Sequence, residues 1–197
     1  NFAAQTVVPE ADIYLIAVPT PLNAHIRVSD LGYVRSAAEM IYPHLRKGNL
    51  VILESTVPPC ASEKLVIPIL EKSGLKAGEF QYVHCPERAI PGKTLYEMVH
   101  NDRIMGGIDN ESAESAKSVY SSYVQGRIYL TDVTTAEFVK LIENTYRDIN
   151  IAIANEFAQV AEDYGVNVWE AIDLANKHPR VNILQPGPGV GGHCIAV

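Results

Sequence analysis

The stretch Asp12-Ile13-Tyr14-Leu15-Ile16-Ala17-Val18 is almost wholly apolar and is closed by Pro19-Thr20-Pro21. A short apolar run that stops at prolines is typical of a strand buried on both faces, as in a parallel sheet. Similar runs predict four more strands, at residues 50–53, 80–84, 103–105 and 127–130.

Helical patterns separate these strands. Asp30 is a predicted N-cap for a helix that stops at Lys47-Gly48, and a second helix begins at Ser62 and stops at Ser73-Gly74. A weakly amphipathic helix is expected at residues 111–122. Strands that alternate with helices predict an α/β fold with a doubly wound, parallel, Rossmann-type sheet, whose ligands bind outside the carboxyl ends of the strands.

The pattern changes at Thr134-Thr135-Ala136-Glu137, which reads as a capping box. The helix that it opens has no Gly or Pro before Gly165, so it is about thirty residues long, against a mean of about 11–12. Asn167-Val168-Trp169-Glu170 is a second capping box, for a helix to about Lys177. We therefore expect two domains, an α/β domain over residues 1–131 and an all-α domain over residues 132–197.

A helix as long as residues 134–164 usually spans domains or subunits. Its apolar set exceeds what a chain of this size can cover by itself, and exposed apolar stripes mark association. We therefore expect a homodimer through this helix, using Ile149, Ile153, Phe157 and Val160.

Composition limits the partners. The chain has 197 residues, 47% of them hydrophobic, and a formal net charge of −7, which argues against nucleic acid or an anionic membrane as a partner. No apolar run reaches the ~18 residues of a membrane span. The three cysteines have no framework spacing, which favours a cytoplasmic protein. Because the chain begins without Met and ends inside an apolar stretch, we expect it to be a piece of a longer protein.

The segment Pro188-Gly189-Val190-Gly191-Gly192-His193-Cys194 places a cysteine directly after a run of glycines. Glycines let the backbone approach a ligand closely, so the thiol is offered to something bound, and a thiolate is a good nucleophile toward a carbonyl. The alternative is a loop with an incidental small hydrophobe. The pairs His84-Cys85 and His193-Cys194 do not predict a metal, because neighbouring residues on an extended segment point to opposite sides.

Lys140 and Asn144 are four residues apart on the long helix and share a face. One interpretation is a solvated polar face. The other is that an ammonium and a carboxamide point together at one oxygen and stabilise the alkoxide or oxyanion that forms there.

Five ordered motifs are similar to those of the UDP-glucose/GDP-mannose dehydrogenase family, and the resemblance covers essentially the whole chain. They are Val18-Pro19-Thr20-Pro21, Glu54-Ser55-Thr56-Val57-Pro58, Cys85-Pro86-Glu87-Arg88, Ala136-Glu137-x-x-Lys140-x-x-x-Asn144 and Gly191-Gly192-His193-Cys194. The sequence of residues 186–197 most resembles the UDP-N-acetylmannosamine dehydrogenase branch of this family.

The resemblance implies an NAD-dependent, four-electron oxidation of the C6 alcohol of a UDP-sugar to a carboxylate. Cys194 would capture the intermediate aldehyde as a thiohemiacetal, whose oxidation gives a thioester that water hydrolyses. Lys140 and Asn144 match the pair that holds the C6 oxygen. Thr56 matches the residue that positions water, and Glu87 matches the base or water activator.

The remaining matched residues are binding residues. Val18, Pro19 and Thr20, with Ser55 and Thr56, match contacts to the dinucleotide. A second set matches the family's contacts to the sugar and diphosphate: Glu87, Arg88, Lys140, Asn144, Arg180, Asn182, Gly189, Gly191 and Gly192.

The chain departs from the family pattern in three places. Pro91 stands where many members carry a second glutamate, which leaves Glu87 as the only carboxylate for that role. The aspartate four residues after the cysteine would be residue 198, and the Gly-rich first βαβ unit that cradles the pyrophosphate is not in this sequence. Residues 1–197 by themselves are therefore expected to be inactive, with only the second part of the Rossmann-type domain present.

Two rival functions remain open. A β-hydroxyacid or 6-phosphogluconate-type dehydrogenase also uses a Lys-x-x-x-Asn pair, but its single hydride transfer needs no thiol, so Cys194 argues against it. A non-catalytic module that binds nucleotide sugars or supports assembly is the other.

Overall fold

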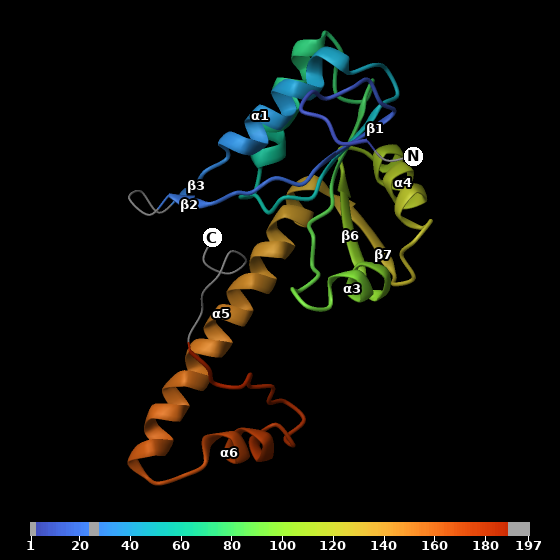
Figure 1. The fold of residues 1–197 in the computed structure, drawn as a ribbon. Helices are drawn as coiled ribbons and strands as arrows, with labels where there is room; N and C mark the ends of the chain where they lie inside the picture. The colour runs from blue at the N-terminus through green and yellow to red at the C-terminus, as the bar shows by residue number, and fades with distance from the viewer. Residues whose placement is uncertain (1–2, 24–27, 189–197) are drawn as a thin grey trace. The chain divides into compact units, whose positions relative to one another are not determined.

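The computed structural model describes residues 3–23 and 28–188 (Figure 1). The chain divides into two compact units, Asn1–Lys140 and Leu141–Val197. The first is built on a five-stranded sheet and the second on helices, so the expected α/β fold followed by a helical part is confirmed.

The sheet has the strand order β1-β4-β5-β6-β7. All five strands lie where the sequence predicts them: β1 (Ile13–Ile16), β4 (Leu50–Leu53), β5 (Gln81–His84), β6 (Arg103–Gly107) and β7 (Ile128–Asp132). Three of the ladders are parallel, but β5 and β6 pair antiparallel, with Val83 opposite Gly107 and His84 opposite Gly106. The sheet is therefore mixed, because the chain turns back between β5 and β6 instead of crossing over.

The expectation that the first strand is buried on both faces is wrong. Tyr14 and Ile16 are buried, whereas Ile13 is 43% and Leu15 51% exposed. The reason is position: β1 is an edge strand, and α4 (Asn110–Tyr120) packs mainly on β4, β5, β6 and β7. The interior strand β4 is buried at all four residues, as a strand with covered faces should be.

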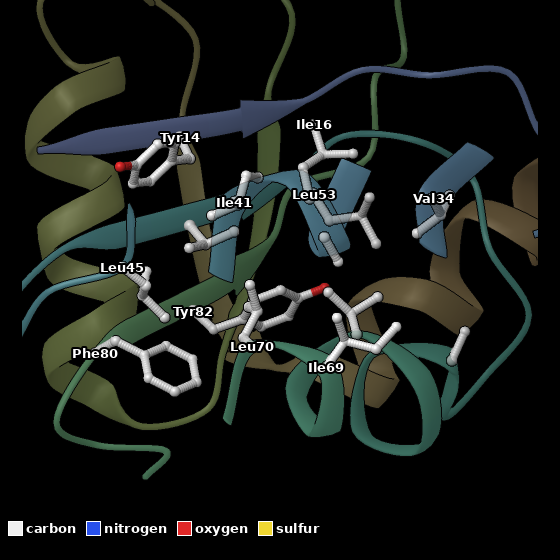
Figure 2. Packing of buried hydrophobic residues seen from close by; sticks show 14 of the residues in the cluster. Tyr14, Ile16, Val34, Ile41, Leu45, Leu53, Ile69, Leu70, Phe80 and Tyr82 are labelled. Carbon is white, nitrogen blue, oxygen red and sulfur yellow. The ribbon is translucent and has the colours of Figure 1, made fainter. Parts of the chain in front are cut away.

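One face of the sheet forms the larger core with α1 (Gly32–Ile41), α2 (Ile67–Leu70) and the turns around them (Figure 2). Tyr14, Leu53 and Tyr82 from the sheet meet Val34 and Ile69 from the helices there. On the opposite face, α4 packs on a second buried cluster that includes Ile52, Val83 and Met105.

The helices that flank the first core begin and end close to the predicted residues. Asp30 Oδ1 accepts the N–H of Gly32 at 2.8 Å, where α1 begins, and the 3-10 turn η1 (Tyr42–His44) follows α1. The second helical segment starts at Ser62 as a π-helical turn, η2 (Ser62–Val66), continues through α2, and ends in the 3-10 turn η3 (Glu71–Ser73). Gly74 stops it with a φ of 93°.

The long helix is α5 (Val133–Asp163), of 31 residues, and α6 (Val168–Ala175) follows it. Asn167 caps α6 as predicted, since its Oδ1 accepts the N–H groups of Trp169 and Glu170. The capping box predicted at Thr134–Glu137 is wrong. The carboxylate of Asp132 holds the first turn instead, accepting from the N–H and the hydroxyl of Thr135 at 2.8 and 2.6 Å, and Glu137 is bound elsewhere.

Three short elements have no clear signal in the sequence. They are the hairpin strands β2 (Leu22–Asn23) and β3 (Val28–Ser29) and the helix α3 (Thr94–His100). None of the helices in the described ranges is long and apolar enough to cross a membrane.

Candidate functional site

The loops that follow β1 and β4 are joined by side-chain hydrogen bonds. The hydroxyl of Ser55 donates to the carbonyl of Val18 at 2.8 Å and accepts the N–H of Val18 at 2.9 Å. The hydroxyl of Thr20 donates to the carbonyl of Thr56 at 2.9 Å. These bonds bring together the predicted cofactor residues Val18, Pro19, Thr20, Ser55 and Thr56 at one edge of the sheet, and they leave Ser55 one lone pair for a ligand.

The loop after β5 joins the same edge. The N–H of Cys85 donates to the carbonyl of Leu53 at 2.9 Å, and the N–H of Glu87 donates to the carbonyl of Glu54 at 3.3 Å. Because β1, β4 and β5 are parallel, their carboxyl ends meet, as the sequence predicts.

The carboxylate of Glu87 accepts three hydrogen bonds from the protein and is one-third exposed. Its Oε1 accepts the N–H groups of Arg88 and Ala89, each at 2.7 Å, and its Oε2 accepts Nη1 of Arg103 at 2.9 Å. Burial alone would raise the pKa of Glu87, but the Ala89 bond and the Arg103 charge outweigh it, so the pKa lies below its ordinary value. Glu87 is therefore an ionised acceptor and a weak base at neutral pH.

A second carboxylate, that of Glu54, lies close enough to Glu87 for their charges to interact. Glu54 accepts the hydroxyl proton of Tyr120 at 2.5 Å, across 66 positions of sequence. Burial raises the pKa of Glu54; the Tyr120 hydrogen bond opposes this and the Glu87 charge adds to it. The signal available in the sequence was that Glu54 stands two residues before Thr56, at the end of a buried strand.

The two arginines near Glu87 differ in their surroundings. Arg88, predicted to contact substrate, donates from Nη1 to the carbonyl of Asp102 at 2.7 Å and is half-buried. Arg103 was not foreseen: its side chain is 1% exposed, it pairs with Glu87, and its guanidinium carbon lies 5.7 Å from the centre of the Tyr120 ring.

Two further buried groups at the end of β5 are uncharged at neutral pH. Burial raises the pKa of the Cys85 thiol to about 12, so this cysteine is not a nucleophile. Burial lowers the pKa of His84 to about 4, and neither of its ring nitrogens has a hydrogen-bond partner among the described residues. His84 is therefore a neutral core residue at physiological pH. No group of three or more His, Cys, Asp or Glu in the described ranges is arranged to hold a metal ion.

The start of α5 is tied to the loop after β4 by Glu137, which is fully buried. Its two carboxylate oxygens accept the N–H groups of Cys60 at 2.6 Å and Ser62 at 2.8 Å. Burial raises the pKa of Glu137, against the effect of these hydrogen bonds. Lys140 follows three residues later and is half-buried; Asn144, a further turn along α5, is buried and belongs to the second unit.

In the second unit, asparagine side chains hold the segment that follows α6. Asn150 donates to the carbonyl of Asn182 at 3.2 Å and accepts the N–H of Leu184 at 3.0 Å, and Asn155 accepts the N–H of Gly187 at 2.9 Å. The predicted substrate residues Arg180 and Asn182 are both exposed on this segment. Sequence reasoning missed Asn150 and Asn155, whose signal was their polarity on a mainly apolar helix.

Four predicted residues, Gly189, Gly191, Gly192 and Cys194, lie outside the residues that the structure describes.

Comparison with known proteins decides the family. Residues 1–124 match the NAD binding domain of the UDP-glucose/GDP-mannose dehydrogenase family, and residues 134–197 match the central domain of the same family. The chain belongs to the UDP-glucose/GDP-mannose dehydrogenase family. The family resemblance seen in the motifs is thereby confirmed, and the cofactor that goes with the first domain is NAD.

The relatives within this family carry related names. Over its whole length the chain is 55% identical to the UDP-N-acetyl-D-mannosamine dehydrogenase of Methanococcus maripaludis, covering 45% of that protein. It is 50% identical to the NDP-N-acetyl-D-galactosaminuronic acid dehydrogenase of Ralstonia solanacearum, covering 48% of it. The structure of UDP-D-ManNAc dehydrogenase from Pyrococcus horikoshii superposes with a TM-score of 0.89 at 50% identity, over 94% of this chain and 44% of that one. The chain thus spans about half the length of these dehydrogenases.

The polar groups at the ends of β1 and β4 fit a dinucleotide. They are hydroxyls and backbone amides without charge, held by the bonds of Thr20 and Ser55, at the edge where doubly wound folds bind nucleotides. Such groups suit ribose hydroxyls and a carboxamide.

Proposed function

We propose that the protein acts as an NAD-dependent nucleotide-sugar 6-dehydrogenase, oxidising the C6 alcohol of a UDP-sugar, UDP-N-acetylmannosamine in the first instance, to the uronic acid. The observation that carries the proposal is that three motifs of this family, far apart in sequence, are joined by hydrogen bonds at one edge of the sheet. Ser55 binds Val18, Thr20 binds Thr56, and the N–H of Glu87 binds the carbonyl of Glu54.

The loops after β1 and β4 would bind the cofactor. NAD, when bound, supplies a hydride acceptor at its nicotinamide ring. Thr20, Ser55 and Thr56, with the backbone of Val18 and Pro19, would hold it. The ordering of these loops by the protein's own hydrogen bonds reduces the entropy that binding must remove.

The first oxidation depends on Lys140 and Asn144, which occupy one face of α5. The ammonium and the carboxamide would both donate to the C6 oxygen of the sugar. As the C6 hydrogen leaves with its electron pair, negative charge on that oxygen is stabilised by the Lys140 charge, and the alcohol becomes an aldehyde.

The second oxidation requires a covalent bond to Cys194. Its thiolate adds to the aldehyde carbon to give a thiohemiacetal, loss of a second hydride gives a thioester, and water releases the carboxylate and the thiol. Thr56 would orient this water. Because the pKa of Glu87 is lowered, we assign Glu87 to accepting a hydrogen bond from water and not to storing its proton. One alcohol, two NAD⁺ and one water give one carboxylate, two NADH and three protons.

Other residues would bind the nucleotide part of the substrate. Arg88 and Arg180 carry charges that suit a diphosphate, Asn182 offers an amide, and Gly189, Gly191 and Gly192 would allow close backbone approach.

A homodimer through α5 is part of the same proposal. Large side chains of the second unit recur along α5 and the residue directly after it at spacings of four, three, four, four, three and four residues, and all are exposed by 43% or more. This spacing is close to an 11-residue repeat, which gives a nearly straight stripe that a second copy of α5 can cover. The stripe consists of Ile142, Tyr146, Ile149, Ile153, Phe157, Val160 and Tyr164.

Incubation of the native-length protein with NAD⁺ and single nucleotide sugars tests the function. We expect UDP-N-acetylmannosamine to give a product with one oxygen more and two hydrogens fewer by mass spectrometry. UDP-glucose and the UDP-linked galactose analogue serve as sugar controls, and 6-phosphogluconate as the substrate of the rival class. Oxidation of 6-phosphogluconate alone would instead support the rival dehydrogenase. Absence of NAD⁺ reduction with every one of these compounds would support the non-catalytic binding module.

A further inference from the structure

Glu137 bonds to two backbone N–H groups that begin the helical segment after β4. Ser62 is the first residue of η2, and Ala61 before it makes no side-chain cap. N–H groups in the first turn of a helix have no partner inside that helix. The carboxylate of Glu137 therefore acts as a cap supplied from another helix, across 75 positions of sequence.

The same carboxylate holds Cys60 in an unusual backbone conformation. Cys60 has a φ of 68° and is the only residue other than glycine with a positive φ in the described part of the chain. Residues with a Cβ avoid this region, so the surrounding contacts must impose it. The 2.6 Å bond from the Cys60 N–H to Glu137 is one such contact, and the bond from the Lys64 N–H to the Cys60 carbonyl is another.

This anchoring is close to a predicted site residue. The loop from Thr56 to Ser62 is fixed at one end by Thr20, which bonds to the Thr56 carbonyl, and at the other end by Glu137. Its position relative to the sheet is therefore set by side chains from the loop after β1 and from α5.

The first turn of α5 is fixed on its other side as well. It leaves the end of β7 beside β6 (Figure 1), where a Cβ on Gly106 would lie 2.3 Å from the Asp132 carbonyl oxygen and 2.7 Å from the Ala136 Cβ. Glu137 comes directly after Ala136, and Lys140 comes three residues later, just under one helical turn.

We propose that Glu137 is a positioning residue that sets the Thr56 loop against the turn of α5 that carries Lys140. The inference rests on the proposed function, because Thr56 and Lys140 are the residues to which that function gives water and oxyanion roles. Glu137 reaches both through covalent backbone and two short hydrogen bonds, all within the first unit.

The test is Glu137→Gln in the native-length protein. Whichever way the amide is oriented, its NH₂ group faces one of the two backbone N–H groups, so one bond is lost while side-chain volume is kept. We expect kcat for nucleotide-sugar oxidation to fall by about 10- to 100-fold, as small displacements of reacting groups do. KM for NAD⁺ and for the sugar nucleotide should stay within about threefold, because the Thr20 and Ser55 bonds remain.

Asp109→Ala is the matched control. Asp109 Oδ1 caps α4 by accepting the Ser112 N–H at 2.7 Å, so this variant also loses one cap of the first unit, on a helix without predicted site residues. It should lower the unfolding midpoint and leave kcat unchanged. A fall in kcat of the same size in Asp109→Ala would show that instability alone explains the effect and would overturn the positioning role.

A second variant keeps the test decisive where Glu137→Gln does not fold. Cys60→Gly removes the Cβ from the residue with positive φ, so the double variant Glu137→Gln/Cys60→Gly lacks that strain. The loss of kcat should persist in it. Whichever of Glu137→Gln and Glu137→Gln/Cys60→Gly folds, a kcat within about twofold of wild type in that variant overturns the proposal. Failure of wild-type protein to oxidise any nucleotide sugar would refute the proposed function itself, which is a separate result.

Discussion

Replacing Glu87 should destabilise the first unit more than replacing its partner Arg103. The two side chains form a 2.9 Å ion pair, but Arg103 is 1% exposed and Glu87 33%. In Glu87→Ala the guanidinium stays buried without its ion-pair partner; it keeps the 3.3 Å bond to the Met98 carbonyl and the contact with the Tyr120 ring. In Arg103→Met the carboxylate keeps the N–H groups of Arg88 and Ala89 and is open to water.

These contacts set the expected magnitudes. Removing one partner of a buried pair costs about 3–5 kcal/mol, and the partial exposure of Glu87 places Glu87→Ala at the low end, about 3 kcal/mol. Arg103→Met loses hydrogen bonds of a charged group but leaves a hydrated carboxylate, so about 1.5–2 kcal/mol is expected. The double variant Glu87→Ala/Arg103→Met buries no charge and should cost less than Glu87→Ala alone.

Urea unfolding at pH 7, followed by circular dichroism, measures these free energies of unfolding. Lys117→Met is the control, because the Lys117–Glu114 pair at 3.1 Å is exposed and should contribute below about 0.5 kcal/mol. The reasoning is refuted if Glu87→Ala costs no more than Lys117→Met, or if the double variant costs the sum of the two single variants.

Three further predictions follow from other residues. Since burial lowers the pKa of His84 to about 4 from 6.5, its contribution to stability is present above pH 6.5 and is lost as the pH falls toward 4, by about 3 kcal/mol at 1.36 kcal/mol per pH unit. Urea unfolding of His84→Leu should show a shallower loss between pH 7 and 4.5, and an unchanged slope contradicts the assignment. Lys140→Ala should lower kcat by roughly 10²–10³-fold in steady-state assays, whereas a change confined to KM would make Lys140 an ordinary binding residue. Ile153→Asp should convert the expected dimer to monomer in light scattering at micromolar concentration, and a wild-type monomer would refute the α5 interface.

The sequence was sufficient for the elements whose burial leaves a continuous apolar run. Strand β4 is buried along its length and β5 at all residues but its first, so their ends, and with them Ser55, Thr56 and Glu87, could be placed before the structure. The direction of β6 could not, because a strand's own residues do not specify which way its neighbour runs. The exposed outer side chains of β1 were mispredicted for a related reason, since an apolar run does not reveal an edge position.

Long-range polar contacts account for the other differences. Glu137 fits a capping box by spacing, yet Asp132 caps α5 and leaves Glu137 to bind Cys60 and Ser62. Glu54 meets Tyr120, and Arg103 meets Glu87, only after the sheet is assembled. Local patterns carry no information about such partners, because the free energy that selects them depends on burial in the folded chain.

The ratio of NADH formed to nucleotide sugar consumed tests the central claim most directly. With native-length protein, excess NAD⁺ and a limiting amount of UDP-N-acetylmannosamine, absorbance at the nicotinamide band and quantified uronic acid should give two NADH per sugar, because a four-electron oxidation through Cys194 removes two hydrides. Cys194→Ser should stop near one NADH per sugar, with aldehyde in place of acid. One NADH per sugar from the wild-type protein, or NADH without uronic acid, would contradict the account.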